Sequence, residues 1–393
     1  MKKIGEIAES GQERFVQVRE GEVKVGERLP WDVYSADGVL LKDAGTLIET
    51  EQQARRLEAE GNQRKMGGVN QATTVTAGRD PITGATANPF ARVEELLRRL
   101  NGLLKALVKP DDPGEVEKRV LRFAEGVQEL VGRDVDAALG ACHLVNQEDY
   151  VVNHTLYVAL LSELVARRLD KPELERRSLV AASLTANIAM LGLQRRLVSQ
   201  AEPLTEEQQK AIHDHPARAA KHLKSLGITD DLWLEIILQH HERLDGGGYP
   251  RGLEGDAFIE EARIMAIADR YHAMISGRKY RKGLMPREAL RKLFMEDGQV
   301  ISADLAQLFI KEVGFFPPGS FVKLANGEAG LVIRRGGQPT TPEVAALASE
   351  QGRFYAQPLR RDTSQGEFAI KGMGRPPSHI PFNVPYLWGY RDR

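Results

Sequence analysis

Hydrophobic and polar positions alternate with a period of two near both ends of the chain and follow a helical period through its middle. Between residues 13 and 48, FVQV alternates, and WDVY and VLL flank Asp37-Gly38, a pair that favours a tight hairpin. After Thr50, the segment EQQARRLEAEG has the capping pattern of a short helix that ends near Gly61. Residues 1–61 are therefore predicted to form a small β-rich module.

A polar stretch separates this module from the next apolar pattern. Residues 62–88 are rich in Gly, Thr, Asn and Gln and poor in large apolar side chains, which predicts a flexible linker. Residues 89–134 are predicted to be connecting helices. The apolar positions of their first helix recur at helical spacing and are Val93, Leu96, Leu97, Leu100, Leu103, Leu104 and Leu107. This stripe indicates a helix that faces a core, and a pair of such helices in a homodimer is the alternative.

From residue 135 to residue 313 the pattern stays helical, with polar or Gly/Pro breaks and no convincing strand alternation. After Gly314 the period returns to two. FVKL and LVIRR flank Asn326-Gly327, a second hairpin signal, and FYAQP and FAI indicate further strands. The expected fold is mainly α: a helical bundle over 135–313, with a β-rich N-terminal module and a short β-rich C-terminal tail over 314–393.

Composition adds little about partners but sets some limits. The 54 basic and 55 acidic residues nearly cancel, so overall charge favours neither a nucleic-acid polymer nor a membrane surface. Cys142 is the single cysteine, which excludes an intrachain disulfide and fits a reducing compartment. No run of 18 apolar residues or signal-peptide pattern occurs, so no membrane span is expected and the cytoplasm is the expected location.

Candidate chemistry lies in the helical region. Four histidines and one acid fall on apolar stripes or at a helix end: His154, His215, His240, His241 and Asp269. Each alone is most simply a core side chain or a cap. Together they offer imidazole nitrogens and a carboxylate, which are the ligands of a divalent transition metal.

The stretch from His240 to Pro250, HHERLDGGGYP, resembles the HHExxDGxGYP signature of HD-GYP domains, a branch of the HD metal-dependent phosphohydrolases. The similarity extends over most of residues 135–335, through HDHP around His215 and RIMAIADRYHAMIS around Asp269. The resemblance implies an all-α bundle that hydrolyses cyclic di-GMP at a site with two or three metals. It also implies a role in bacterial second-messenger signalling.

The chain departs from the family in the segment that names it. Where members carry an LLHDIGKIGI-like helix, this chain has LTANIAMLGL. Ala186 takes the place of the histidine, Asn187 of the aspartate and Met190 of the lysine, and Tyr150 takes the place of a glutamate found in three-metal members. By resemblance, one metal position keeps only His154 and Asp269.

The second position keeps His215, His240 and His241, which suffice for one divalent ion such as Fe, Mn or Zn. If the site is fully degenerate, no metal is expected. His272 follows Asp269 by three residues on the same helix face and is a candidate replacement ligand. Without a second metal and its anionic bridge, hydrolysis should be impaired.

Resemblance also implies residues that bind the dinucleotide. Tyr249, Arg278 and Arg281 match family positions that contact it. The loop residues Asp245, Gly246, Gly248 and Pro250 belong to the same signature, and this loop is also a surface on which a GGDEF-domain protein could dock.

Three readings remain open from the sequence. The first is a regulatory module that binds cyclic di-GMP or a partner protein and turns over substrate weakly or not at all. The second is an active phosphodiesterase with a one-metal or rearranged site. The third is a helical core without any ligand.

Overall fold

The computed structural model describes most of the chain, and all statements below concern these residues: 14–18, 23–27, 29, 33–34, 40–42, 46–60, 62–65, 88–110, 112–144, 149–277, 283–296, 302–377 and 380–390. Two compact units divide the chain. One holds the described residues of 1–86 with 326–330 and 345–361, and the other holds those of 87–325, 331–344 and 362–393.

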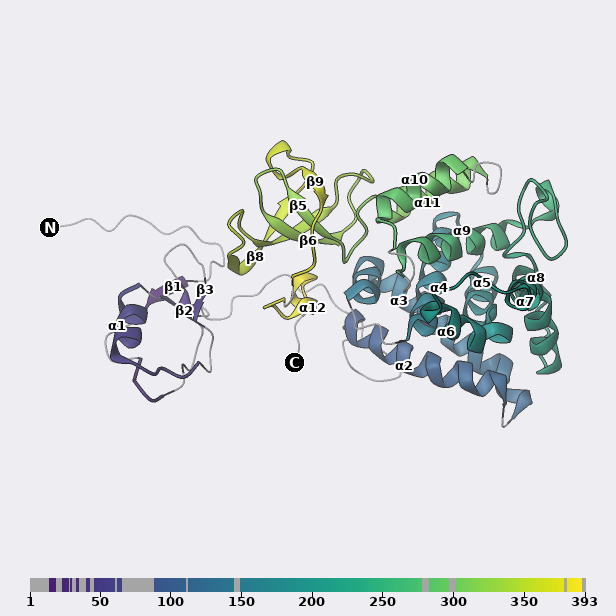
Figure 1. Ribbon diagram of the computed structural model, residues 1–393, viewed down its shortest axis with the longest axis horizontal. Helices are drawn as coiled ribbons and strands as arrows, with labels where there is room; N and C mark the ends of the chain where they lie inside the picture. Colours follow the sequence, from purple (N-terminus) through teal and green to yellow (C-terminus); the bar gives the residue numbers. More distant parts are fainter. Residues whose placement is uncertain are drawn as a thin grey trace. The chain divides into compact units, whose positions relative to one another are not determined.

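The N-terminal module is a four-stranded sheet with one helix (Figure 1). Its elements are β1 (Arg14–Gln17), β2 (Val33–Tyr34), β3 (Leu40–Lys42), α1 (Glu51–Glu60) and β4 (Asn62–Lys65). The strand order is β1-β4-β2-β3, and every pair is antiparallel. A small core of Val18, Val23, Leu29, Val33, Ile48, Ala54 and Leu57 lies within it.

Strand β4 corrects the predicted end of this module. The segment NQRK was assigned to the linker because it has no apolar alternation, yet it pairs with β1 on one side and β2 on the other. Backbone hydrogen bonds hold a strand whatever its side chains are, so a polar strand between two partners leaves no hydrophobic signal. The module therefore extends to Lys65, and residues 66–87 of the predicted linker lie outside the described residues.

Helices make up the middle of the chain, as predicted, and no strand occurs among the described residues of 114–313 (Figure 1). The α-helices are α2 (Pro89–Val108), α3 (Val116–Leu144), α4 (Tyr150–Arg168), α5 (Glu173–Thr185), α6 (Leu191–Ser199), α7 (Glu206–Ser225), α8 (Asp231–Gln239), α9 (Glu260–Ile275), α10 (Pro286–Glu296) and α11 (Ala303–Val313). The 3₁₀ turns are η1 (Pro113–Glu115), η2 (Ile188–Met190) and η3 (Gly255–Ala257). Helix α4 is buried over nearly its whole length and packs against α3, α5 and α9.

The leucine stripe of α2 faces this bundle. Val93, Leu96, Leu100 and Leu104 are at most 1% exposed, and α2 packs against α3 and α4. The core-facing interpretation is confirmed. Residues 89–134, expected as connectors, thus lie in the same compact unit as the rest of the bundle.

The C-terminal region is a five-stranded sheet followed by a short helix. Its elements are β5 (Phe321–Leu324), β6 (Ala329–Arg334), β7 (Glu343–Ala348), β8 (Phe354–Asp362), η4 (Gly366–Phe368), β9 (Ile370–Met373) and α12 (Val384–Leu387), and the strand order is β8-β7-β6-β5-β9. Strand β7 was not predicted. Its sequence, EVAALA, is buried at five of six positions, so the apolar run lacks the alternation of a half-exposed strand.

Part of this region packs on the second half of α3. Trp388 lies so close to Gly140 that a Cβ there would sit 2.4 Å from the indole ring. Asp136 pairs with Arg335, and Asp134 accepts a hydrogen bond from the Tyr390 hydroxyl at 2.8 Å. The C-terminal region is thus partly built into the helical unit and is not a free tail.

Candidate metal centre

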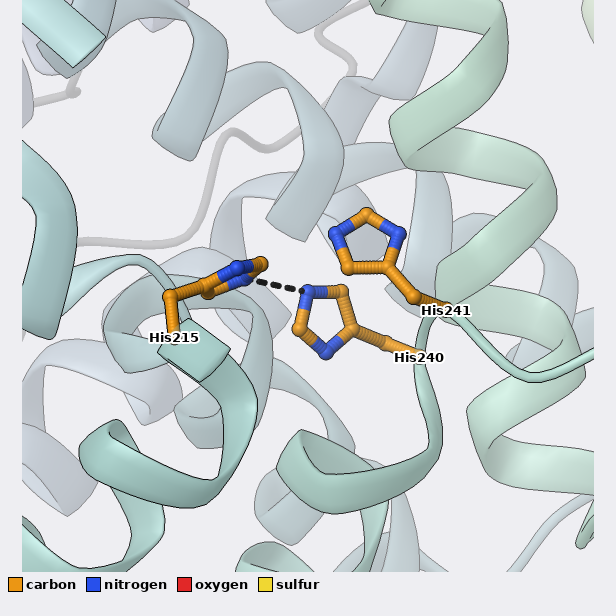
Figure 2. Close-up of side chains that lie close together, drawn as sticks. All are labelled: His215, His240 and His241. Atoms are coloured by element: carbon orange, nitrogen blue, oxygen red, sulfur yellow. Dashed lines mark hydrogen bonds between the residues drawn. The ribbon is translucent and has the colours of Figure 1, made fainter. Parts of the chain in front are cut away.

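Three histidines from two segments of chain converge on one point (Figure 2). His215 lies within α7, while His240 and His241 follow the end of α8. One ligand nitrogen from each ring lies within 4.8 Å of the others, and this is the one such group of three or more His, Cys, Asp or Glu among the described residues. The Nε2 atoms of His215 and His240 are 3.2 Å apart.

Backbone carbonyls fix the tautomers of two of these rings. His215 donates from Nδ1 to the Ile212 carbonyl at 2.5 Å, and His240 donates from Nδ1 to the Ile237 carbonyl at 2.7 Å. A carbonyl accepts and cannot donate, so each Nδ1 carries the ring proton and each Nε2 of a neutral ring presents a lone pair. This is how a second partner orients a metal-ligating histidine.

Burial keeps the rings neutral. It lowers the pKa of His215 to about 3, with a further contribution from the nearby His240. It also lowers the pKa of His240 and places that of His241 well below the usual value. Two Nε2 lone pairs that face each other at 3.2 Å repel unless a proton or a cation lies between them. Since a proton is disfavoured, this donor set fits a divalent metal ion.

The other half of the predicted site, formed by His154 and Asp269, has a different pattern of hydrogen bonds. His154 on α4 meets Asp269 on α9, with 2.9 Å between His154 Nε2 and Asp269 Oδ1. Its second nitrogen, Nδ1, lies 2.8 Å from Nδ1 of His272. Because a carboxylate only accepts, His154 donates to Asp269, and both of its nitrogens are engaged with side chains.

The electrostatics of this half favour the Asp269 anion. Burial raises the pKa of Asp269, but the hydrogen bond from His154 and the neighbouring imidazoles outweigh it and hold the pKa well below its usual range. His272, with a pKa lowered by burial, packs its ring on Tyr157 and lies near Ser276 Oγ. In the structure His272 is a hydrogen-bond partner of His154.

A cavity of about 220 Å³ joins the two halves. It is lined by Tyr150, His154, Asn187, Met190, Gln194, Leu197, Val198, Ile212, His241, Tyr249, Asp269 and Ala273. Ala186 directly follows α5, is fully buried and has no side-chain atom that could bind a metal, and Asn187 directly precedes η2. None of the described residues that line the cavity is Lys or Arg, so its permanent charge comes from Asp269.

The signature loop places Tyr249 at this cavity. The Tyr249 ring stacks between His213 and His241, with centroids 4.8 Å from each. Asp245 instead bonds to its own loop, through Arg243 and the Gly247 amide. Pro250 follows Tyr249 through a cis peptide bond. Arg278 and Arg281 lie outside the described residues.

The path of the backbone requires glycine at two positions of the loop. Gly246 adopts a φ of +72°, and a Cβ there would also lie 2.7 Å from the Glu254 side chain. At Gly248 a Cβ would lie 2.4 Å from the Cα of Glu242. The glycines of the signature therefore serve the path of the loop and its close approach to the HHE segment.

Glu242 organises this loop, which the sequence reasoning did not assign. Its side chain is 2% exposed, and its two oxygens accept the amides of Arg251 at 2.7 Å and Leu253 at 3.0 Å. A glutamate directly after two metal-ligand candidates and before a glycine-rich turn was the available signal. Its contacts fix the loop end that carries Tyr249.

Comparison with known proteins finds a family model and several relatives that match this chain. A family model described as HD domain matches residues 141–305. Cyclic di-GMP phosphodiesterase PA4108 of Pseudomonas aeruginosa is 26% identical over 283 residues, which cover 71% of this chain and 68% of the relative. The 3'3'-cGAMP-specific phosphodiesterase 3 of Vibrio cholerae serotype O1 is 30% identical over 168 residues, which cover 43% of this chain and 34% of that protein.

A solved structure is also similar to the chain. Bd1817, an HDG"Y"P protein from Bdellovibrio bacteriovorus, superposes with a TM-score of 0.49 at 17% identity, over 75% of this chain and 98% of that one. No helix in the described part of the chain combines the length and apolar character needed to cross a membrane. Residues 141–305 thus match the HD domain family, and the stretch HHERLDGGGYP within them resembles the HD-GYP signature.

Proposed function

We propose that the helical domain binds a cyclic dinucleotide, with cyclic di-GMP as the first candidate, at a site that holds one divalent metal ion. We further propose that it hydrolyses the phosphodiester slowly or not at all and acts mainly as a regulatory module. The observation that carries this proposal is a contrast between two pairs of side chains. The Nε2 lone pairs of His215 and His240 face each other, whereas Nε2 of His154 is bonded to Asp269. The names of the relatives support the class of ligand.

The residues that would hold the ion are His215, His240 and His241. A divalent metal bound there supplies Lewis acidity toward a phosphoryl oxygen and lowers the pKa of a coordinated water. The chain itself fixes the Nε2 lone pairs of His215 and His240, and it presents His241 and the Tyr249 ring at the cavity wall. Asp269, held as an anion beside His154, supplies negative charge in the cavity and can accept a hydrogen bond from a water molecule.

Slow turnover follows from what the opposite wall lacks. Ala186 provides no ligand, and Asn187 provides a neutral amide where an anionic bridge between two cations would be needed. Met190 lines the cavity where the family has a cation. Each lost electrostatic contact to a transition state is worth on the order of 10²–10³ in rate, so the combined loss should be severe.

Ligand recognition is less affected by these losses. Tyr249 is held in a stack with His213 and His241, so its ring position is fixed before ligand binds. The loop around it is anchored by Glu242 and turns through Gly246 and Gly248. A rigid surface loop of this kind also suits a partner protein, and a GGDEF-domain protein is the partner we propose.

An active one-metal phosphodiesterase is the second candidate. The observation that favours it is that His241 and the anionic Asp269 line the same cavity, so a metal site and a fixed negative charge face one space. In this interpretation the Asp269 carboxylate orients the attacking water by accepting a hydrogen bond from it. The two candidates share the ligand and differ in the rate.

The deciding experiment measures binding and hydrolysis of cyclic di-GMP by the full chain loaded with Fe or Mn. The proposal predicts binding that depends on His240 and turnover at least 10²-fold below that of a two-metal homologue assayed alongside. Metal-loaded protein that turns over at the homologue's rate would establish the second candidate. Absence of nucleotide binding would overturn both.

A further inference from the structure

A second cavity adjoins the metal centre and has no role in the function proposed above. Its volume is about 350 Å³, and it is lined mainly by the segment that joins α6 to α7. It is lined by Leu197, Gln200, Ala201, Glu202, Pro203, Leu204 and Ile212. Leu197 and Ile212 line the metal-centre cavity as well, so the two spaces share a wall.

The two cavities together have a size that suits a single ligand. The metal-centre cavity, about 220 Å³, lies below the range of roughly 300–1,000 Å³ in which small-molecule sites fall, while the two cavities together lie within it. Ile212 connects the second cavity to the metal centre, because it lines both cavities and its carbonyl accepts the hydrogen bond that fixes the tautomer of His215. A phosphodiester at the histidines would therefore place an attached nucleoside toward the second cavity.

The second cavity is built and held by hydrogen bonds. Gln200 and Gln208 bond to each other through both amide groups, at 3.0 and 2.8 Å. Gln200 Nε2 also reaches the carbonyls of Glu202 and Pro203. Thr205 and Gln208 form a reciprocal capping box at the start of α7. These bonds fix the path of residues 200–205 and hold the wall in place.

The chemistry of the lining suits a purine. Leucine, isoleucine and proline side chains give apolar surfaces on which a flat base can lie, and Leu204 is 40% exposed there. Glu202 is the one charged side chain among the residues that line this cavity, and its Oε2 accepts the Ala201 amide at 3.2 Å. A carboxylate accepts hydrogen bonds and donates none.

We propose that this cavity is a base subsite in which Glu202 selects guanine over adenine. The proposal rests on the proposed function, since it takes the ligand to be a cyclic dinucleotide. Guanine presents two adjacent donors, N1–H and the exocyclic amine, and a carboxylate can accept both. Adenine presents one donor beside the acceptor N1, which a carboxylate repels. One such pair corresponds to discrimination between bases on the order of 10-fold in dissociation constant.

If one subsite recognises one base, it predicts the relative dissociation constants of three cyclic dinucleotides. Cyclic di-GMP and 3'3'-cGAMP both contain a guanine that can enter the subsite, so their dissociation constants should agree within a few-fold. Cyclic di-AMP has none and should bind on the order of 10-fold more weakly or worse. The ratio between cyclic di-AMP and cyclic di-GMP therefore reports on the subsite alone.

The test is calorimetric titration of the metal-loaded full chain with these three nucleotides. Glu202→Gln should bring the ratio of dissociation constants close to one, because an amide can accept and donate. Glu206→Gln, an exposed acid on the first turn of α7 that does not line the cavity, is the matched control and should keep the wild-type ratio. Leu204→Ser should weaken all three nucleotides without changing the ratio.

Two outcomes would overturn the inference while leaving the proposed function intact. One is wild-type protein that binds cyclic di-AMP as tightly as cyclic di-GMP. The other is a guanine preference that Glu202→Gln leaves unchanged. If none of the three nucleotides binds, the proposed function fails and the inference fails with it.

Discussion

The two halves of the site use the same side chain in opposite ways. In the half formed by His215, His240 and His241, backbone carbonyls take the Nδ1 protons of two rings, so the Nε2 lone pairs face a common point. In the half formed by His154 and Asp269, side chains take both nitrogens of the histidine. A histidine becomes a good ligand because of what holds its other nitrogen, and residue identity alone does not reveal that.

The largest expected effect, on metal content and turnover, comes from restoring metal ligands to the half formed by His154 and Asp269. The triple variant Ala186→His, Asn187→Asp, His272→Asp restores two ligands and removes the imidazole that engages His154. We expect the metal content to rise from one ion to two per chain and turnover of cyclic di-GMP to rise by on the order of 10²-fold or more. Elemental analysis and a hydrolysis assay measure the two effects.

His272→Asp alone is the control for this variant, and it should gain neither metal nor activity. Thermal unfolding verifies that each variant is folded. A triple variant that is folded and binds two ions, but turns over no faster, would show that ligand loss is not the cause of slow hydrolysis.

Removal of the metal should lower the free energy of unfolding, and this effect should depend only on the half formed by His215, His240 and His241. A ligand that binds only the folded state adds about 2.7 kcal/mol to the free energy of unfolding when its free concentration is 100 times its dissociation constant. Chelation should remove that contribution in wild type and in His154→Ala, and should change nothing in His240→Ala. Chelator-insensitive unfolding of wild type would argue against a metal in this half.

The loop that carries Tyr249 should weaken when its anchor is altered. Glu242→Gln replaces one acceptor oxygen by a donor that faces a backbone amide, so a buried amide loses its partner at a cost of about 1–3 kcal/mol. Chemical denaturation measures this change, and the metal content should stay near one. Glu235→Gln, which breaks an exposed ion pair with Arg251, is the control and should cost less than 1 kcal/mol.

The smallest effect concerns the packing behind His154. The Tyr157 hydroxyl bonds to Nε2 of His143 at 2.9 Å, and Nδ1 of His143 bonds to the Pro318 carbonyl at 2.6 Å. Tyr157→Phe should cost about 1 kcal/mol in free energy of unfolding and leave metal content unchanged. A loss of metal in this variant would mean that the two halves are not independent.

Periodicity predicted the helical middle and most strands well, because the apolar residues of an amphipathic helix or strand recur with the period of that element. It missed β4, a polar strand held by its backbone, and β7, whose apolar run is buried on both faces. It also treated residues 89–134 and 314–393 as separate parts. Contacts such as Trp388 against Gly140 leave no local pattern, so the sequence could not show that they join the bundle.

The candidate site was predicted better by motif than by spacing. His215, His240 and His241 are brought together as the sequence suggested, and Tyr249 lines the same cavity as His241. The engagement of His154 by His272 and the anchoring by Glu242 depend on side chains from different elements meeting at hydrogen-bond distance. Sequence separation hides such contacts, and the residue types involved have many other uses.

The metal-to-protein ratio tests the central claim most directly. Elemental analysis of the purified full chain after loading with Fe, Mn or Zn should give one ion per chain in wild type, about one in His154→Ala and close to none in His215→Ala. Two ions per chain in wild type, or equal loss of metal in His154→Ala and His215→Ala, would contradict the account.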